Sequence, residues 1–197
     1  CHYLACLFFD KRCVSTLKYT ELIMLSSAFD LGEHLRLTNL EYSISTVLWN
    51  RYPLPSIDLS FNRWNSIKYL NDSISDFHVD IVNVPNDAGG LYLFYVKCPI
   101  LSGITEYPFY IGRAQITQGQ NLRKRVKEYF QKYARDGERP KITKMFKYWS
   151  SDLYLAYLPL HQNNDIIDFE KNLINGLLLP MNDQIPEKEI RDAVKAF

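Results

Sequence analysis

Residues 109–114 constrain the fold of this chain more than any other segment, because they join a strand to a helix. Their sequence, Phe-Tyr-Ile-Gly-Arg-Ala, is typical of the apolar end of a short strand followed by a glycine turn. Further along, Leu122, Val126, Tyr129 and Phe130 recur at the spacing of one helical face, and basic residues fill the positions between them. A strand that leads into a basic amphipathic helix limits the chain to a fold that contains both a sheet and helices.

The rest of the C-terminal half predicts a small sheet with helices around it. Residues 91–96 and 153–158 are apolar runs of strand length, and they join the strand before Gly112 in one sheet. The connection that leads to Tyr110 contains two prolines and a Ser-Gly pair, which predicts a long hairpin loop. Helices are expected from Gln120, over 141–149, around Glu170 up to Pro180, and after Pro186. The predicted class is α+β, with a mainly antiparallel three-stranded sheet flanked by helices.

A mostly helical lobe is predicted for residues 1–85, ahead of a core formed by residues 86–197. The expected elements of the lobe are a strand in 1–16, helices over 18–29, from a capping box at 38–41 and over 64–74, and a strand at 77–81. The turn-rich loop 85–90 marks the boundary. The lobe carries no motif that assigns a function, and packing or dimerisation is favoured over a helix-turn-helix.

Charge is distributed unevenly along the chain. The net charge is +1, yet residues 113–147 contain eleven Lys or Arg residues against three acidic ones. Such a block is expected of a phosphate-binding face, although a solvated helical surface gives a milder version of it. The residues assigned to DNA or phosphate binding are Arg113, Arg123, Lys124, Lys127, Lys141 and Lys144.

Composition argues against a membrane protein and against a zinc site. The chain has no run of about 18 apolar residues, so neither a transmembrane helix nor a membrane partner is expected. Its four cysteines form no Cys-x-x-Cys pair, which favours a reduced, cytoplasmic protein. The apolar N-terminus lacks the basic lead and cleavage site of a secretory signal. The sequence begins at Cys1 rather than at Met, which leaves open whether residues precede it.

Several short motifs follow one another in the order seen in a known nuclease family. Gly-Leu-Tyr at 90–92 and Tyr-Ile-Gly at 110–112 are followed by Asn-Leu-Arg-Lys-Arg-Val at 121–126, and then by Glu170 and Asn182. Together they resemble the GIY-YIG nuclease superfamily, and locally the nuclease module of bacterial excision repair. The resemblance does not extend to the N-terminal lobe.

The resemblance implies phosphodiester hydrolysis by tyrosines, an arginine, a metal-binding glutamate and a supporting asparagine. In this chain the implied catalytic residues are Tyr92, Tyr110, Arg125, Tyr129, Glu170 and Asn182. The sequence departs from the family at Arg113, where many members carry a lysine. Arginine supplies a fixed charge and cannot accept a proton.

Glu170 is the candidate metal ligand on chemical grounds as well. It shares the apolar face of its predicted helix, where an ionised carboxylate needs a cation or a partner. A single carboxylate with retained water molecules suits Mg²⁺ or Mn²⁺. The alternative is a carboxylate at the edge of the apolar stripe that pairs with a lysine. For Asn182, the alternative is a turn residue that ends the same helix.

Tyr92 and Tyr110 are the candidates for the activation of water. A phenol with a pKa near 10 is a poor base unless a cation lowers that value, and the sequence leaves open which of the two is the base. Arg125 and Tyr129 lie four residues apart, so they project from one side of a helix. Arg125 can hold two phosphate oxygens, with Arg123 as its rival. The alternative for Tyr129 is a buried aromatic residue whose hydroxyl is satisfied.

The favoured function is a Mg²⁺-dependent DNA endonuclease of a restriction or phage-defence type. The subtype follows by analogy from the stand-alone size and the helical lobe, and mobile-element and repair nucleases are the other subtypes. A second hypothesis is a catalytically silent, nuclease-like DNA-binding subunit of a larger complex. A third is an interaction scaffold whose tyrosines are all buried. One active site cuts one strand, so double-strand cleavage would need a homodimer or sequential nicking.

Overall fold

The computed structural model describes residues 35, 38–101 and 103–196 of the chain. The chain divides into two compact units, Cys1–Asn39 and Leu40–Phe197, and every element named below belongs to the second unit. The strand expected in residues 1–16 and the helix expected over 18–29 lie outside the described residues.

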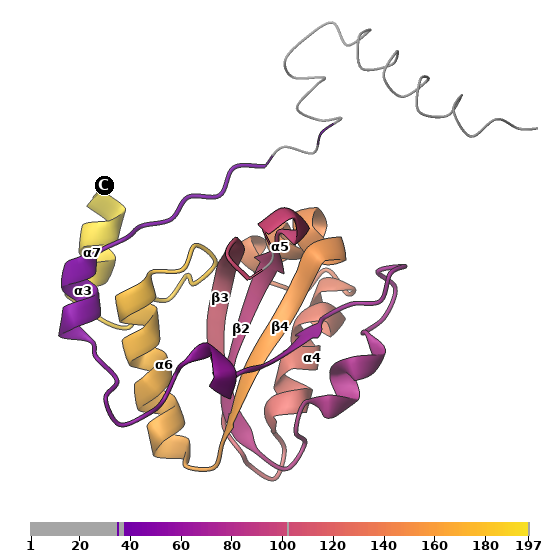
Figure 1. The fold of residues 1–197 in the computed structure, drawn as a ribbon, viewed down its shortest axis with the longest axis horizontal. Coiled ribbons are helices and arrows are strands. Elements are labelled where there is room, and N and C mark those ends of the chain that lie inside the picture. The colour runs from indigo at the N-terminus through magenta and orange to yellow at the C-terminus, as the bar shows by residue number, and fades with distance from the viewer. Residues whose placement is uncertain (1–34, 36–37, 102, 197) are drawn as a thin grey trace, which may run out of the picture. The chain divides into compact units, whose positions relative to one another are not determined.

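The second unit is an α+β fold built on a four-stranded antiparallel sheet (Figure 1). The strands are β1 (Asn65–Lys68), β2 (Gly89–Lys97), β3 (Glu106–Ala114) and β4 (Leu153–Leu160), in the order β1-β4-β2-β3. The α+β class and three of the strands are therefore confirmed. The predicted number of strands was too low by one, because β1 is a fourth strand that pairs with β4.

Strand β1 lies where the sequence predicted a helix. Ile67, Leu70 and Ile74 have helical spacing, but Ile67 is paired with Leu155 of β4 and is buried. Ile74 has a positive φ of 57° and lies in a tight turn, in which the Asn71 amide bonds to the carbonyl of Asp76. The chain is therefore extended and then reversed in this segment, because pairing with β4 outweighs a weak local helical pattern.

Five α-helices accompany the sheet in the described part of the chain. They are α3 (Thr46–Arg51), α4 (Leu122–Tyr133), α5 (Pro140–Trp149), α6 (Asn163–Leu177) and α7 (Lys188–Ala196). Short 3-10 turns lie at η1 (Phe61–Arg63), η2 (Val79–Asn83), η3 (Pro99–Leu101) and η4 (Ser150–Asp152). Helices α4 to α7 confirm the four predicted for the C-terminal half.

Two further predictions in the first half differ from the structure, one in the start of a helix and one in the type of element. The helix expected from the capping box at residues 38–41 begins only at Thr46, where the Ser45 hydroxyl accepts a hydrogen bond from the Leu48 amide. The strand expected at residues 77–81 is instead largely the 3-10 turn η2, which starts after His78. Alternating apolar residues over so short a segment do not distinguish a strand from a 3-10 turn.

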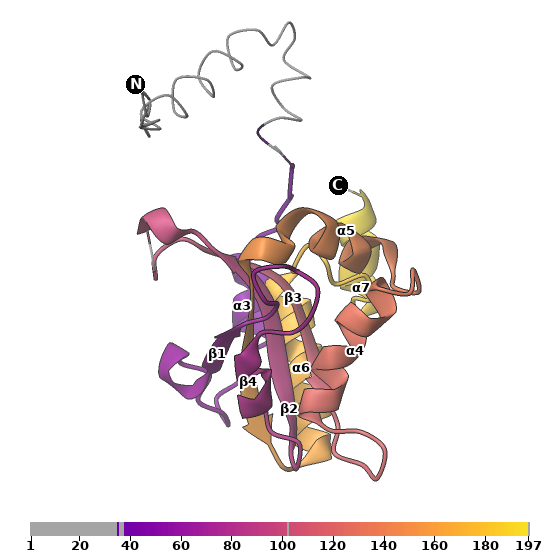
Figure 2. The ribbon, with the colours of Figure 1, turned by 90° about the vertical axis from the view of Figure 1, so that its right-hand side faces the viewer.

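The helices cover the two faces of the sheet separately. Helix α4 lies in front of the sheet and α6 behind it in the view of Figure 2. On the side of α4 and α5, the core contains Phe94, Phe130 and Phe146, all buried. On the side of α6, Ile111 packs with Ile174. Side chains that alternate along β3 therefore enter two different layers.

Strand β3 is at the edge of the sheet, and the chain after α6 covers its free side. The Met181 amide bonds to the Phe109 carbonyl at 3.0 Å, next to the buried side chain of Asn182. This cover satisfies backbone groups that an edge strand would otherwise expose. The segment after α6 thus lies along β3 at the edge of the sheet.

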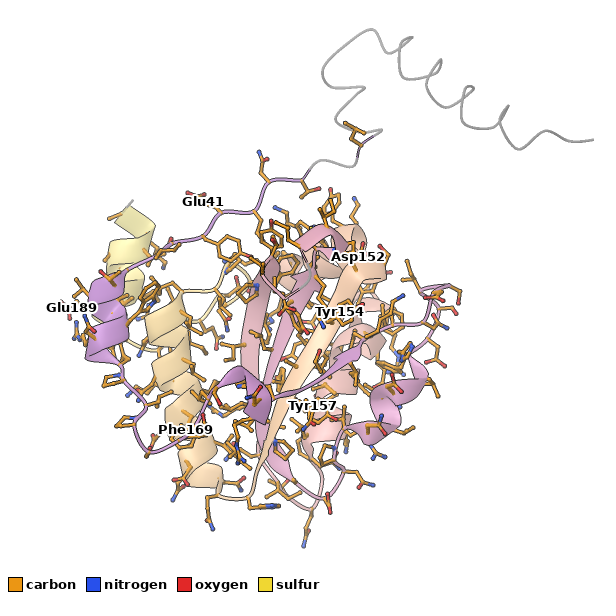
Figure 3. The ribbon with its side chains drawn as sticks, viewed as in Figure 1. Glu41, Asp152, Tyr154, Tyr157, Phe169 and Glu189 are labelled. Carbon is orange, nitrogen blue, oxygen red and sulfur yellow. The ribbon has the colours of Figure 1, made fainter. Side chains whose placement is uncertain are left out.

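Ion pairs connect the start of the last helix to α3, and Figure 1 labels both helices. Arg51 of α3 donates to Glu187 at 2.7 Å and to Glu189 at 3.2 Å, and Figure 3 shows Glu189 beside α3. No helix in the described part of the chain is long and apolar enough to cross a lipid bilayer.

Candidate active site

A cleft of about 880 Å³ lies beside β3. Its lining includes residues of β2, β3, α4 and α6 and of the segment after α6. All the residues assigned to catalysis from the sequence line this cleft: Tyr92, Tyr110, Arg125, Tyr129, Glu170 and Asn182.

The pairing of β2 with β3 brings the two glycine-tyrosine motifs together. Tyr92 lies directly opposite Gly112, and Gly90 lies opposite Ala114. Gly90 has a φ of 148°, and a Cβ at this position would collide with the Leu158 carbonyl of β4. A residue with a side chain at position 90 would therefore separate β2 from β4.

Three tyrosines form a hydrogen-bonded group that we call the tyrosine cluster: Tyr92, Tyr110 and Tyr129. The Tyr129 hydroxyl lies 2.7 Å from that of Tyr92 and donates to that of Tyr110 at 3.1 Å. All three side chains are buried, and the centroids of the three rings lie within 6.4 Å of one another. Because a hydroxyl has a single proton, Tyr92 donates to Tyr129, and the Tyr110 proton is left for a group outside the cluster.

Burial raises the pKa of two members of the tyrosine cluster. The pKa of Tyr92 is above its ordinary value because of burial and then because of Tyr110, and Arg125 only partly opposes this. Burial and the neighbouring tyrosines raise the pKa of Tyr129 well above its ordinary value. Without a further cation, both side chains are neutral phenols at physiological pH.

Arg125 is held beside the tyrosine cluster by an acidic partner on its own helix. It donates to Glu128 at 2.7 Å, and Gln120 donates to the same carboxylate at 2.8 Å. Its guanidinium lies over the Tyr129 ring, 5.2 Å from the centroid, and donates to the Tyr129 hydroxyl at 3.5 Å. Arg125 and Tyr129, four residues apart, therefore project from the same side of α4, as the sequence predicted.

Glu170 of α6 is paired with Arg113 of β3, and not with a lysine. Its side chain is 15% exposed. Burial raises the pKa of Glu170, and the attraction and hydrogen bond of Arg113 offset this only in part. The fold therefore holds a carboxylate whose negative charge is incompletely compensated.

The surroundings of Glu170 fit a metal ion that has few protein ligands. No group of three or more His, Cys, Asp or Glu residues suited to a metal is found among the residues that the structure describes. A buried carboxylate whose charge is only partly compensated does suit Mg²⁺ or Mn²⁺ that retains water ligands. Glu170 is the residue that would hold such an ion, and Arg113 would have to release part of that carboxylate.

Asn182 bonds to the backbone of β3 through both ends of its amide. Its Oδ1 accepts from the Ile111 N–H at 3.0 Å, and its Nδ2 donates to the Ile111 carbonyl at 2.8 Å. Its own N–H bonds to Leu179, so it also lies in the turn after α6. Asn182 therefore fixes the position of β3 between Tyr110 and Gly112.

Asn182→Ala is expected to destabilise the protein by about 1–3 kcal/mol, because two buried backbone groups would lose their partner. Urea unfolding measures this loss. Asn163→Ala is the matched control, since Asn163 makes the same pair of bonds to Ile116 but is only half-buried. An equal or larger loss in the control would contradict the special role of Asn182.

The basic residues assigned to phosphate binding do not all lie in the cleft. Arg113 lines the cleft, whereas Arg123 donates to the carbonyls of Val84 at 2.6 Å and Val82 at 2.7 Å. The other contacts are those of Lys124 with the Gly119 carbonyl, Lys127 with the Phe77 ring and Lys141 with Asp183, while Lys144 is exposed on α5. Arg123 thus holds η2 in place, whereas Arg125 lies beside the tyrosine cluster.

Cleft residues that the sequence did not single out include Lys132, Arg139 and Arg191. Arg139 precedes Pro140 at the start of α5 and is half-buried. Arg139 belongs to the basic block, but the direction of its side chain depends on where α5 packs, and no local sequence pattern predicts that packing.

The comparisons with known proteins add no relative. The sequence matches no family model and no curated protein, and the structure matches no solved structure.

Proposed function

We propose that this chain is a metal-dependent endonuclease of the GIY-YIG type that hydrolyses phosphodiester bonds in DNA. The observation that carries this proposal is the convergence of six residues on one cleft from β2, β3, α4, α6 and the segment after α6. The motifs are up to 90 residues apart in the sequence, from Tyr92 to Asn182. The α+β fold and the pairing of Tyr92 with Gly112 also support the proposal.

Bound at Glu170, Mg²⁺ or Mn²⁺ would polarise the phosphate and make a water molecule more acidic. Arg125, held by Glu128, would bind phosphate oxygens and stabilise the charge that accumulates on them. Tyr110 is the end of the hydroxyl chain, so it would donate its proton in a hydrogen bond to the substrate phosphate or to the attacking water. Tyr92 and Tyr129 would hold Tyr110 in place.

The pair formed by Arg113 and Glu170 favours a second candidate function. Arg113 is bonded to the Glu170 carboxylate, which is the group that a metal ion would need as its ligand. The same cleft would then bind DNA phosphates without cutting, as a nuclease-like DNA-binding subunit. This alternative requires no divalent metal and predicts binding that weakens as salt rises.

The test is the nicking of supercoiled plasmid with Mg²⁺ or Mn²⁺, against the same reaction with a chelator. We expect metal-dependent nicking that falls about 10- to 100-fold in Arg125→Gln, because a charged hydrogen-bond donor is lost. Arg135→Gln removes the same charge from an exposed position outside the cleft lining and is expected to leave the rate nearly unchanged. Plasmid binding without any cutting under both metals would favour the silent subunit.

A further inference from the structure

Arg139 contacts the tyrosine cluster through Tyr110, whereas Arg125 of α4 contacts it through Tyr129. It is the last residue before α5, with extended backbone angles of −65° and 149°. Its guanidinium lies over the Tyr110 ring, 5.5 Å from the centroid, and donates to the Tyr110 hydroxyl at 3.5 Å. It also lines the cleft.

The surroundings of Arg139 repeat those of Arg125. Each guanidinium lies over a tyrosine ring, donates to the hydroxyl of that ring at 3.5 Å and contacts a glutamate. For Arg139 the glutamate is Glu138, which is 5% exposed and whose Oε1 accepts from the Arg139 N–H at 2.9 Å and from Nε at 3.5 Å. The hydroxyls reached by the two arginines are 3.1 Å apart, so both cations are within reach of one group bound between them.

The contacts of Arg139 differ from those of an arginine that only stabilises the fold. Its bonds to Tyr110 and to the Glu138 side chain are both 3.5 Å long, and its side chain is 39% exposed. Arg123 is the contrast within this chain, since it makes bonds of 2.6 and 2.7 Å to the backbone carbonyls of Val84 and Val82. Long bonds of a partly exposed guanidinium contribute little to stability and leave donors for a ligand.

We propose that Arg139 is a second phosphate-binding residue of the cleft, which binds the same DNA phosphate as Tyr110 while Arg125 binds it from the other side. The inference rests on the proposed function for the nature of the substrate. Two planar cations on either side of one phosphate would neutralise the charge that builds up on its oxygens in the transition state. Neither cation would need to leave its glutamate.

The experiment compares Arg139→Gln with Arg135→Gln, which removes the same charge from an exposed site four residues earlier. The affinity for a short DNA duplex is measured without divalent metal over a range of salt concentrations. The slope of log K against log salt is negative, and we expect it to become less steep by about 0.9 in Arg139→Gln, as for one lost phosphate contact. In the control it should change much less. Equal slopes in the two variants would overturn the inference.

Cleavage and stability complete the test. With Mg²⁺, we expect nicking by Arg139→Gln to fall about 10- to 100-fold, with partial recovery in Arg139→Lys, which keeps the charge. The thermal midpoint of both variants should stay close to that of the wild type. A marked fall in the midpoint would make Arg139 a structural residue, and nicking equal to that of the control would show that Arg139 does not contribute to cleavage. If the wild type does not cut, the proposed function fails, and the salt slopes still decide whether Arg139 binds phosphate.

Discussion

Glu170→Gln is expected to abolish metal-dependent nicking while leaving the protein at least as stable as the wild type at neutral pH. The amide keeps the shape of the carboxylate but removes the negative charge that a hard cation requires. Loss of the metal removes several kcal/mol of transition-state stabilisation, so the rate should fall by about 10³-fold or more.

The stability of Glu170→Gln should depend on pH, because the pKa of Glu170 is raised in the folded protein. A group whose pKa is higher folded than unfolded stabilises the fold while it is protonated. That contribution is complete below the unfolded pKa of about 4.3 and is lost as pH rises through the higher folded pKa. The wild type therefore loses stability relative to the neutral glutamine variant between these two values.

Thermal unfolding in the absence of metal, at pH 4 to 7.5, measures this difference. The midpoint of Glu170→Gln relative to the wild type should increase with pH and then level off. Asp168→Asn is the matched control, since Asp168 is an exposed carboxylate two residues earlier on α6. Nicking by Glu170→Gln at a tenth of the wild-type rate or more would exclude Glu170 as the essential metal ligand.

Gly112→Ala is expected to disturb both the fold and the cleft. A Cβ at position 112 would lie 2.5 Å from the Tyr92 hydroxyl oxygen and 2.7 Å from the ring carbon that carries it. The ring of Tyr92 would have to move, which would disturb its hydrogen bond of 2.7 Å to Tyr129. Overpacking of this kind costs about 1–3 kcal/mol, and a catalytic group displaced by about 1 Å costs about 10²-fold in rate.

Urea unfolding and the nicking assay measure the two effects of Gly112→Ala. Gly119→Ala is the control, because a Cβ there meets no atom within 4 Å. The cost to stability should shrink when Gly112→Ala is made in a Tyr92→Ala background, since the collision is with the Tyr92 ring. An unchanged cost in that background would show that the ring is not the cause.

The sequence by itself determined the helices of the C-terminal half. In α4, Asn121 caps the first turn by accepting from the Lys124 amide at 2.8 Å, and Leu122, Val126 and Phe130 are buried as their spacing predicts. Caps and helical periodicity depend on residues only three or four positions apart, so they can be recognised in one sequence. Residues 64–74 have helical spacing of apolar residues but form no helix, because Asn65–Lys68 pair with β4.

For the site, the sequence determined which residue types are present, and the tertiary structure decided what each one contacts. Charge alone did not separate Arg123, which binds backbone carbonyls, from Arg125, which lies over Tyr129. It also gave no reason to single out Arg139. The pairing of Arg113 with Glu170 joins residues 57 positions apart. Such contacts depend on strand register and helix packing, which are set by burial across the whole domain and not by neighbours in the sequence.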